Sequence, residues 1–201
     1  MKNTYCTIYL TRHGETEWNE KKLIQGHSDV PLNKKGEEQA KQLGKELENI
    51  DFTTVFSSDL LRAKNSAEII IAEKKLKVVT IKTLRERFFG RFERKPLNVL
   101  RKTIGEVMLV SKEKQKELNL FDVENDEDII SRLIPFMKKV ANKYLGKNVL
   151  MVTHGGLLRA FLSYVDYKIP EYTERPMKNA GYLIIESDGE EFEIKEEKLF
   201  K

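Results

Sequence analysis

The chain has 201 residues, a length that suits one domain with its own hydrophobic core. Apolar residues make up 40% and charged residues 34%, and no apolar run approaches the roughly 20 residues that span a bilayer, so we expect no membrane partner. The net charge of +4 is modest and no basic motif with interleaved aromatic residues occurs, so nucleic acid is not an expected partner either. The first residues lack the apolar core of a signal peptide, and the single Cys6 excludes an intramolecular disulfide. We therefore expect a cytoplasmic protein.

The chain up to Ile81 alternates short apolar strands with amphipathic helices. The pattern predicts, in chain order, a strand that ends at Ile8–Leu10, a loop over 11–32, a helix from the N-cap Asn33 to about Asn49, a strand at Thr53–Phe56, a helix capped by Asp59 and a strand at Val78–Ile81. Strands that alternate with helices indicate an α/β fold whose sheet is covered on both faces.

The rest of the chain continues this alternation after an irregular stretch at 84–126. The pattern predicts a short helix from about Pro96 to Leu109, a helix from about Asp126 to Tyr144 that Pro135 should kink, a strand at Val149–Val152, a helix at Gly156–Val165, and strands at Gly181–Glu186 and Phe192–Lys195. Asp188-Gly189 is typical of a hairpin turn between the last two strands. No repeat or linker divides the chain, so we expect one domain.

Two histidines follow predicted strands directly. His13 stands in Arg-His-Gly after the first strand, and His154 stands in Thr-His-Gly-Gly after Val149–Val152. A lone histidine at a strand end is more often a satisfied polar residue than a functional one. Ligands of open α/β sheets, however, bind beyond the carboxyl ends of the strands, and glycine after each histidine lets the backbone approach an anion. The pair therefore favours a functional site.

An ordered set of motifs over nearly the whole chain resembles the histidine phosphatase superfamily, which is also called phosphoglycerate mutase-like. The motifs are Leu10–Thr16, Trp18-Asn19, Gln25-Gly26, Asp29–Leu32, Gly36–Ala40, Ser57–Ala63, Leu84–Glu86, Phe89-Gly90 with Glu93, and Val152–Gly156 with Arg159. The resemblance implies a three-layer α/β/α sandwich with a mostly parallel central sheet. It also implies a single domain over 1–201, with a variable insertion at about 85–125 that faces the substrate.

The same resemblance assigns roles to particular residues. It implies that His13 is the nucleophile that takes the phosphoryl group, that His154 is a second imidazole in the pocket, and that Glu86 is the acid that protonates the leaving oxygen. The runner-up for the acid is Glu15, for which we expect a structural role. The resemblance places seven residues at the substrate or around it, of which the two arginines would clamp the phosphate: Arg12, Arg62, Asn19, Gln25, Gly26 and Gly155, together with His154.

Three functions fit these motifs. The first is a metal-independent phosphomonoester hydrolase that acts on a small phosphorylated metabolite through a phosphohistidine. The second is a phosphoglycerate mutase, although mutases of the family generally carry extra segments for which this chain has little room. The third is a non-catalytic phosphate-binding module. No His-Glu-x-x-His motif or cysteine pair indicates a metal site, and we expect no cofactor.

The segment 85–102 holds the densest basic cluster, with seven cations: Arg85, Arg87, Arg91, Arg94, Lys95, Arg101 and Lys102. The cluster is either a solvated surface or a rim for a second anionic group, and its sequence resembles the fructose 2,6-bisphosphatase branch. Two positions depart from the family pattern. Arg94 replaces the usual glycine after Glu93, and 122–125 keeps only the glutamate, Glu124, of a Gly-Gly-Glu-Ser-type motif. The edge strand near the end of the chain is compatible with a monomer or a homodimer.

Overall fold

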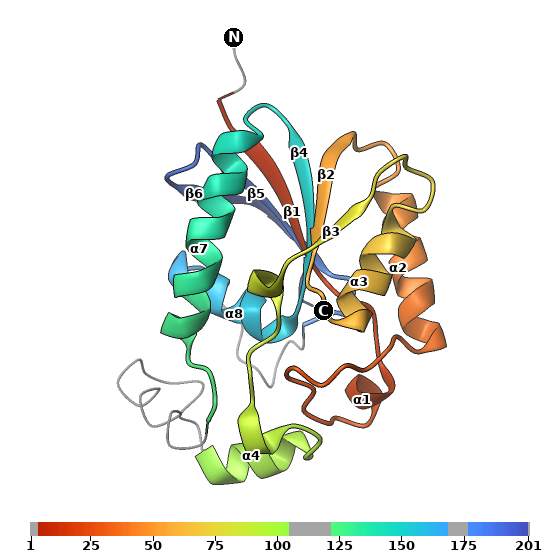
Figure 1. Cartoon of the computed structure of the whole chain (residues 1–201), viewed down its shortest axis with the longest axis vertical. Coiled ribbons are helices and arrows are strands. Elements are labelled where there is room, and N and C mark those ends of the chain that lie inside the picture. The colour runs from red at the N-terminus through yellow and green to blue at the C-terminus, as the bar shows by residue number, and fades with distance from the viewer. Residues whose placement is uncertain (1–3, 105–121, 169–176, 201) are drawn as a thin grey trace.

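A six-stranded sheet forms the centre of the computed structural model, which describes residues 4–104, 122–168 and 177–200 (Figure 1). In chain order the strands are β1 (Cys6–Arg12), β2 (Phe52–Ser57), β3 (Val78–Thr80), β4 (Asn148–Thr153), β5 (Tyr182–Ser187) and β6 (Phe192–Glu197). Their order across the sheet is β3-β2-β4-β1-β5-β6. The pairs β1–β4, β2–β4 and β2–β3 are parallel, whereas β5 is antiparallel to both of its neighbours. The sheet is therefore mostly parallel, as predicted.

Helices cover both faces of this sheet and make three layers (Figure 1). One layer holds α2 (Lys34–Glu46) and α3 (Leu61–Ile70), and the other holds α7 (Asp126–Lys143) and α8 (Gly155–Tyr164). Side chains of β4 alternate between the two cores: Leu150 and Val152 pack with α2 and α3, while Val149 and Met151 pack with α7 and α8. All four are fully buried, which explains the unbroken apolar run of this strand.

Most predicted elements lie within a few residues of the observed ones, and Asn33 caps α2 through a bond from the Gly36 amide at 2.8 Å. The predicted loop at 11–32 contains a one-turn helix, α1 (Glu17–Glu20). The helix expected after Pro96 is α4 (Leu97–Ile104), and residues 105–109 of that prediction lie outside the described residues. Short 3₁₀ turns at Lys82–Leu84 and Gly90–Phe92 complete the elements in the described part of the chain.

The prediction that Asp59 caps the following helix is wrong. The N-cap of α3 is Leu60, which makes no side-chain cap bond, and the carboxylate of Asp59 pairs instead with Arg85 at 2.7 Å. Asp29, from a distant loop, accepts a hydrogen bond from the Leu61 amide at 2.7 Å. A carboxylate does stabilise this helix N-terminus, but it comes from another segment of the chain.

Strand pairing brings the two His-Gly motifs to one edge of the sheet. In the register between β1 and β4, Arg12 lies opposite Thr153, and the His13 amide donates to the Thr153 carbonyl at 3.0 Å. The histidines that follow these two strands therefore leave the sheet side by side. Among the described residues, no helix is both long and apolar enough to cross a membrane.

Candidate active site

His13 and His154 meet in a buried pocket at the carboxyl ends of β1 and β4. Their ring centroids lie 5.1 Å apart with an angle of 58° between the planes, and the side chains are 2% and 0% exposed. Neither ring nitrogen of His154 has a hydrogen-bond partner among the described residues. Because buried polar groups are nearly always hydrogen-bonded, two such nitrogens in one ring indicate a place prepared for a ligand.

The Gly14 carbonyl fixes the tautomer of His13. Nδ1 of His13 lies 2.6 Å from the Gly14 oxygen, and because a carbonyl only accepts, Nδ1 carries the proton. The lone pair of the neutral ring then lies on Nε2. Burial, followed by the charges of Arg62 and Arg12, lowers the pKa of His13 well below its ordinary value. His13 therefore presents a neutral nitrogen that can act as a nucleophile at neutral pH.

Arg62 places a buried positive charge beside the two histidines. Its side chain on α3 is 0% exposed, and Nη1 and Nη2 donate to the carbonyls of Ser28 and Gly26 at 2.9 and 2.8 Å. Its Nε has no partner among the described residues. Burial lowers the pKa of Arg62 to about 10 while the charge of Glu86 opposes this shift, so the guanidinium stays charged at neutral pH. A buried cation with an available N–H group is suited to bind an anion.

The carbonyls that bind Arg62 belong to the loop at 25–29, and the conformation of this loop depends on Gly26 and Glu93. Gly26 has φ +51°, and a Cβ atom there would lie 2.1 Å from Oε1 of Glu93. The two carboxylate oxygens of Glu93 accept hydrogen bonds from the His27 amide and the Ser28 hydroxyl, both at 2.8 Å. A side chain at 26 would therefore be strained and would displace the carboxylate of Glu93, which keeps the carbonyls of this loop directed at Arg62.

The carboxylate of Glu86 lies at the N-terminus of α8, whose N-cap is His154. Its oxygens accept hydrogen bonds from the amides of Arg87 at 2.8 Å and Gly156 at 3.2 Å. A Cβ atom at Gly156 would lie 2.4 Å from Oε1 of Glu86, so a glycine at this position permits the contact. The backbone carbonyl of Glu86 accepts from Nε2 of His27 at 2.8 Å. These bonds hold an acidic group next to the histidine pair.

The remaining predicted binding residues lie around this pocket in different ways. Arg12 donates from Nη1 to the Met177 carbonyl at 2.6 Å, and a Cβ atom at Gly155 would lie 3.4 Å from its Nε. Arg12 thus lies against the first residue of α8. Asn19 uses its side-chain oxygen to close the capping box of α1. Gln25 is 8% exposed, and its Oε1 has no partner among the described residues.

Sequence reasoning missed two residues that contact the backbone of the first motif. Nδ2 of Asn179 donates to the His13 carbonyl at 3.2 Å, and the hydroxyl of Ser66 accepts from the Gly14 amide at 2.9 Å. No sequence signal marks Asn179. Ser66 lies four residues after Arg62, one turn along the same helix, and this spacing was the only available indication.

Glu15, the runner-up for the acid, has the structural role that we expected. Its two oxygens accept from Nδ2 of Asn33 at 3.1 Å and Nζ of Lys35 at 2.9 Å, so it anchors the start of α2. No group of three histidine, cysteine, aspartate or glutamate side chains with metal-ligand geometry occurs in the described ranges.

The structure divides the basic cluster, and two of its arginines do not form a substrate rim. Arg85 forms a bidentate pair with Asp59, both bonds being 2.7 Å. Arg87 is 5% exposed, pairs with Asp126 and donates to the Glu124 carbonyl at 2.6 Å. Both guanidinium groups therefore serve to fasten the insertion to the rest of the fold.

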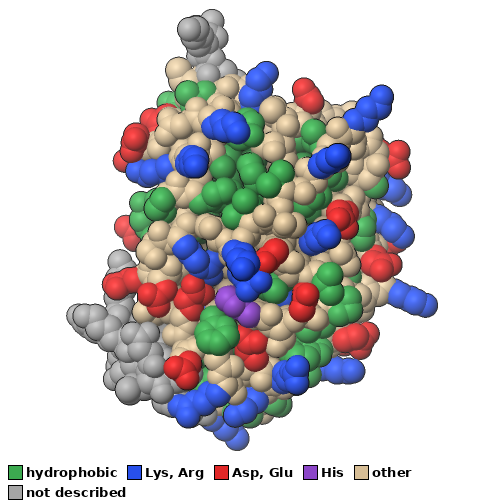
Figure 2. Space-filling view, viewed as in Figure 1, with side chains coloured by type: hydrophobic (Ala, Val, Ile, Leu, Met, Phe, Trp, Pro, Cys, Tyr) green, Lys and Arg blue, Asp and Glu red, His purple; other side chains and the backbone are tan. Residues whose placement is uncertain are grey.

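Four other cations of the cluster are exposed at the surface: Arg91, Arg94, Lys95 and Lys102. Arg91 and Lys95 lie over the ring of Phe92, 5.8 and 5.7 Å from its centroid. Arg94 has φ +69°, a left-handed conformation that glycine adopts at lower cost, which explains why glycine is usual at this position. On the face shown in Figure 2, lysine and arginine side chains are spread among acidic ones.

Glu124, the residue kept from the second altered motif, ties the insertion to α7. Its carboxylate accepts from Nε of Arg132 at 2.7 Å and from the Phe88 amide at 3.0 Å. The next residue, Asn125, caps α7 in a capping box with Asp128. The position thus keeps a structural function although its neighbours differ from the family pattern.

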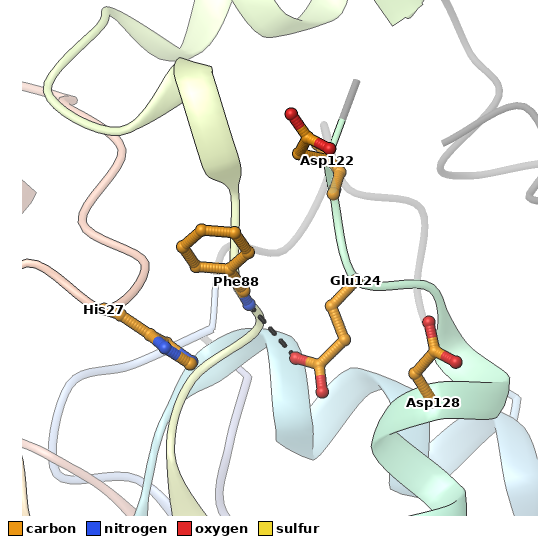
Figure 3. Close-up of a pocket in the computed structure, with 6 residues that line it drawn as sticks. His27, Phe88, Asp122, Glu124 and Asp128 are labelled. Carbon is orange, nitrogen blue, oxygen red and sulfur yellow. Dashed lines mark hydrogen bonds between the residues drawn. The ribbon is translucent and has the colours of Figure 1, made fainter. Parts of the chain in front are cut away.

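A cleft of about 580 Å³ opens beside the segment that carries Glu86 (Figure 3). Figure 3 shows Phe88 between His27 on one side and three carboxylates on the other. The ring centroids of His27 and Phe88 lie 5.2 Å apart. The cleft is lined by His27, Phe88, Asp122, Val123, Glu124 and Asp128. Carboxylates rather than guanidinium groups line it, so this cleft is not the basic rim that the sequence suggested.

The lowered pKa values of the two histidines predict how the stability of the protein depends on pH. Burial and the neighbouring charge of Arg62 also lower the pKa of His154. Because both folded-state pKa values lie below the unfolded value of about 6.5, the unfolded chain takes up protons first, and stability should fall as pH drops below about 6.5. Two such groups give a slope of up to roughly 2.7 kcal/mol per pH unit.

Urea unfolding between about pH 5 and pH 7.5 measures this slope. Inorganic phosphate should flatten it, because a bound anion favours the protonated rings, and H13A should reduce it by about half. A slope that is the same in the wild type and in H13A would contradict the burial of a neutral His13.

The fold and this pocket define an α/β protein whose buried pocket, built around two histidines and an arginine, is suited to an anion. The chain belongs to the histidine phosphatase superfamily (branch 1), whose family model matches residues 8–198. It is 33% identical over 190 residues to the uncharacterized phosphatase PhoE of Bacillus subtilis, which covers 94% of this chain and 92% of that protein. It is 30% identical over 184 residues to a probable phosphoglycerate mutase GpmB of Salmonella arizonae, with coverage of 92% and 85%.

Solved structures agree with this assignment. A phosphoglycerate mutase from Bacillus anthracis superposes with a TM-score of 0.84 at 28% identity and covers 96% of this chain and 92% of its own. YhfR of Bacillus stearothermophilus superposes with a TM-score of 0.80 at 29% identity and covers 94% of this chain and 95% of its own. The family and these relatives indicate an enzyme of the phosphatase or mutase type.

Proposed function

We propose that this chain is a metal-independent phosphomonoester hydrolase that works through a phosphohistidine on His13, with a small phosphorylated metabolite as its substrate. The observation that carries the proposal is the neutral imidazole of His13, whose Nδ1 is held by the Gly14 carbonyl at 2.6 Å next to a fully buried arginine. The proposal needs no metal and no cofactor, because the protein's own cations can neutralise a phosphate.

In the first step, Nε2 of His13 attacks the phosphorus atom, so that a P–N bond forms while the P–O bond to the alcohol breaks. Glu86 donates a proton to the leaving alkoxide, which departs as an alcohol. The side chain of Glu86 accepts hydrogen bonds from the amides of Arg87 and Gly156, and these bonds would hold it near the leaving oxygen.

In the second step, water attacks the phosphorus of the phosphohistidine and the P–N bond breaks. Glu86, now a carboxylate, takes the proton from the attacking water, and His13 returns to its neutral form. Inorganic phosphate leaves and the cycle closes. A mutase would instead transfer the phosphoryl group to a second alcohol, so access of water to the intermediate decides between the two reactions.

Hydrogen-bond donors would stabilise the charge on the three transferred oxygens. Nε of Arg62 and the ring of His154 are buried donors without a partner among the described residues, and they would bind these oxygens with Arg12. The alcohol portion of the substrate would lie toward Phe88 and the cleft beside it. Asn19, Gln25, Gly26 and Gly155 complete the proposed binding set, either by contact or by allowing close approach of the backbone.

The proposed function is tested by phosphate release from a panel of phosphomonoesters in the presence of EDTA. The panel contains fructose 2,6-bisphosphate, 2,3-bisphosphoglycerate, 3-phosphoglycerate, nucleoside monophosphates, phosphoserine and p-nitrophenyl phosphate. We expect phosphate release that EDTA does not reduce. Transfer of label to added 3-phosphoglycerate, without release of phosphate, would favour the mutase. Strong inhibition by EDTA that a metal reverses would contradict the metal-free reaction.

Glu86→Gln should reduce kcat more for substrates whose leaving group must be protonated than for substrates whose leaving group departs without a proton. For alkyl phosphates we expect kcat to fall about 10²- to 10⁴-fold, the range for loss of a general acid. For p-nitrophenyl phosphate, whose phenolate leaves without a proton, the loss should stay below about tenfold, and this substrate also reports structural damage. Steady-state kinetics on both substrates gives the comparison. Equal losses on the two substrates would remove Glu86 from the role of acid.

A further inference from the structure

The hydroxyl of Ser66 joins two parts of the pocket that are far apart in the sequence. Its oxygen accepts from the Gly14 amide at 2.9 Å and its hydrogen is donated to the Arg62 carbonyl at 2.6 Å. Ser66 lies on α3 and is 1% exposed, so water does not compete for either bond. The serine therefore links the segment after β1 to the helix that carries the buried guanidinium.

Gly14 needs such a link because a glycine allows the peptides on its two sides to rotate freely. The peptide between His13 and Gly14 is hydrogen-bonded at both of its polar groups. Its N–H group donates to the hydroxyl of Ser66. Its carbonyl accepts from the side chain of Asn179 and from the Ala180 amide, each at 3.2 Å. With this peptide fixed, the next carbonyl, that of Gly14, can meet Nδ1 of His13.

The peptide after Gly14 has its own support. The Glu15 amide donates to Oε1 of Gln39 on α2 at 2.9 Å. Helices α3 and α2, through Ser66 and Gln39, thus hold the two peptides that flank Gly14. The direction of the Gly14 carbonyl, and with it the tautomer of His13, depends on both helices.

We propose that Ser66 is a positioning residue that keeps the proton of His13 on Nδ1 and its lone pair on Nε2. It does so by holding the peptide between His13 and Gly14 at a fixed position relative to the backbone of Arg62. The consequence for catalysis rests on the proposed function. The consequence for the tautomer does not, because it follows from the hydrogen bonds of the protein itself. Ser66 touches neither substrate nor the reacting nitrogen.

The test compares Ser66→Ala with a matched control, Ser187→Ala. Ser187 is also 1% exposed, and its hydroxyl oxygen also accepts a glycine amide, that of Gly189, at 3.1 Å. It lies opposite Cys6 in the register, at the other end of β1 from the pocket. The two substitutions therefore remove the same kind of buried hydrogen bond, but only one removes it next to His13.

In single-turnover experiments we expect S66A to slow phosphorylation of the enzyme about 10- to 100-fold, the loss expected from misplacing a reacting group. In steady-state assays its KM should change little. S187A should phosphorylate at the wild-type rate. Ser66→Thr, which keeps the hydroxyl, should recover most of the rate lost in S66A. Equal rates in S66A and S187A, or no recovery in S66T, would overturn the proposal.

Nitrogen NMR of the His13 ring gives a readout that does not depend on activity. In the wild type and in S187A, Nδ1 should give the signal of a protonated nitrogen and Nε2 that of an unprotonated one. In S66A the ring should shift toward the other tautomer. An unchanged tautomer in S66A would overturn the proposal even if the enzyme is active. A wild-type enzyme that forms no phosphohistidine, but shows the expected tautomers, would overturn the proposed function alone.

Discussion

Replacing His13 with alanine should abolish turnover, with a loss in kcat of about 10⁴-fold or more, because no other group in the pocket can replace a covalent nucleophile. The ring centroid of His154 lies only 5.1 Å from that of His13, but no backbone carbonyl among the described residues fixes the tautomer of His154. Stopped assays of phosphate release on the best substrate of the panel measure the loss.

His27→Ala is the matched control for this experiment, since His27 is the third histidine of the chain. It lies in the wall of the cleft, where its Nε2 donates to the Glu86 carbonyl. We expect H27A to change KM more than kcat and to keep the covalent intermediate. If H13A kept more than about a tenth of wild-type kcat, the nucleophilic role of His13 would be excluded.

The second large effect should come from Arg62. In Arg62→Lys the charge remains, but a lysine cannot donate to the carbonyls of Gly26 and Ser28 and at the same time keep an N–H group directed at the phosphate. We expect kcat/KM to fall about 10²- to 10³-fold in R62K, the size seen when a donor to a transition-state oxygen is lost. In R62M, which also removes the charge, the loss should be larger.

Stability measurements separate this effect from damage to the fold. Urea unfolding of R62K and R62M shows how much the loop at 25–29 is weakened, and the kinetics are measured where each variant is fully folded. Binding of inorganic phosphate should weaken in the same order as kcat/KM. If R62M bound phosphate as tightly as the wild type, Arg62 would have no part in holding the anion.

Much of this pocket could be predicted from the sequence, because its main elements are local. The apolar run before each His-Gly motif predicts a buried strand, and parallel strands that are neighbours in the sheet must deliver their following residues to one edge. His13 and His154 meet for this reason. The hairpin at Asp188-Gly189 and the N-cap at Asn33 follow from short-range turn and cap chemistry in the same way.

The contacts that sequence reasoning misplaced all join distant segments. Asp59 has the composition of an N-cap, yet it pairs with Arg85, while Asp29 from another loop reaches the start of α3. The basic cluster appears uniform in the sequence, but Arg87 is buried against Asp126 across 39 residues. Charge density along a chain does not indicate which cations find a carboxylate in the fold.

The cleft depends on the same kind of long-range contact. Asp122 belongs to the segment 122–125, whose motif departs from the family pattern, and Asp128 lies in the first turn of α7. Both line the cleft with Phe88, whose amide donates a hydrogen bond to the carboxylate of Glu124. Predicting an acidic wall rather than a basic one required the position of α7 relative to the segment after Glu86. The lining of this cleft is therefore set by contacts that the sequence does not display.

The most direct test of the central claim is to trap the covalent intermediate. Enzyme mixed with phosphate-labelled substrate, quenched within milliseconds and digested under alkaline conditions should yield an acid-labile phosphohistidine, and mass spectrometry should place it on the peptide that contains His13. The account predicts label on His13 that disappears in H13A and persists in H27A. Label on His154 or on a carboxylate, or turnover with no label at all under conditions where hydrolysis of the intermediate is slow, would contradict it.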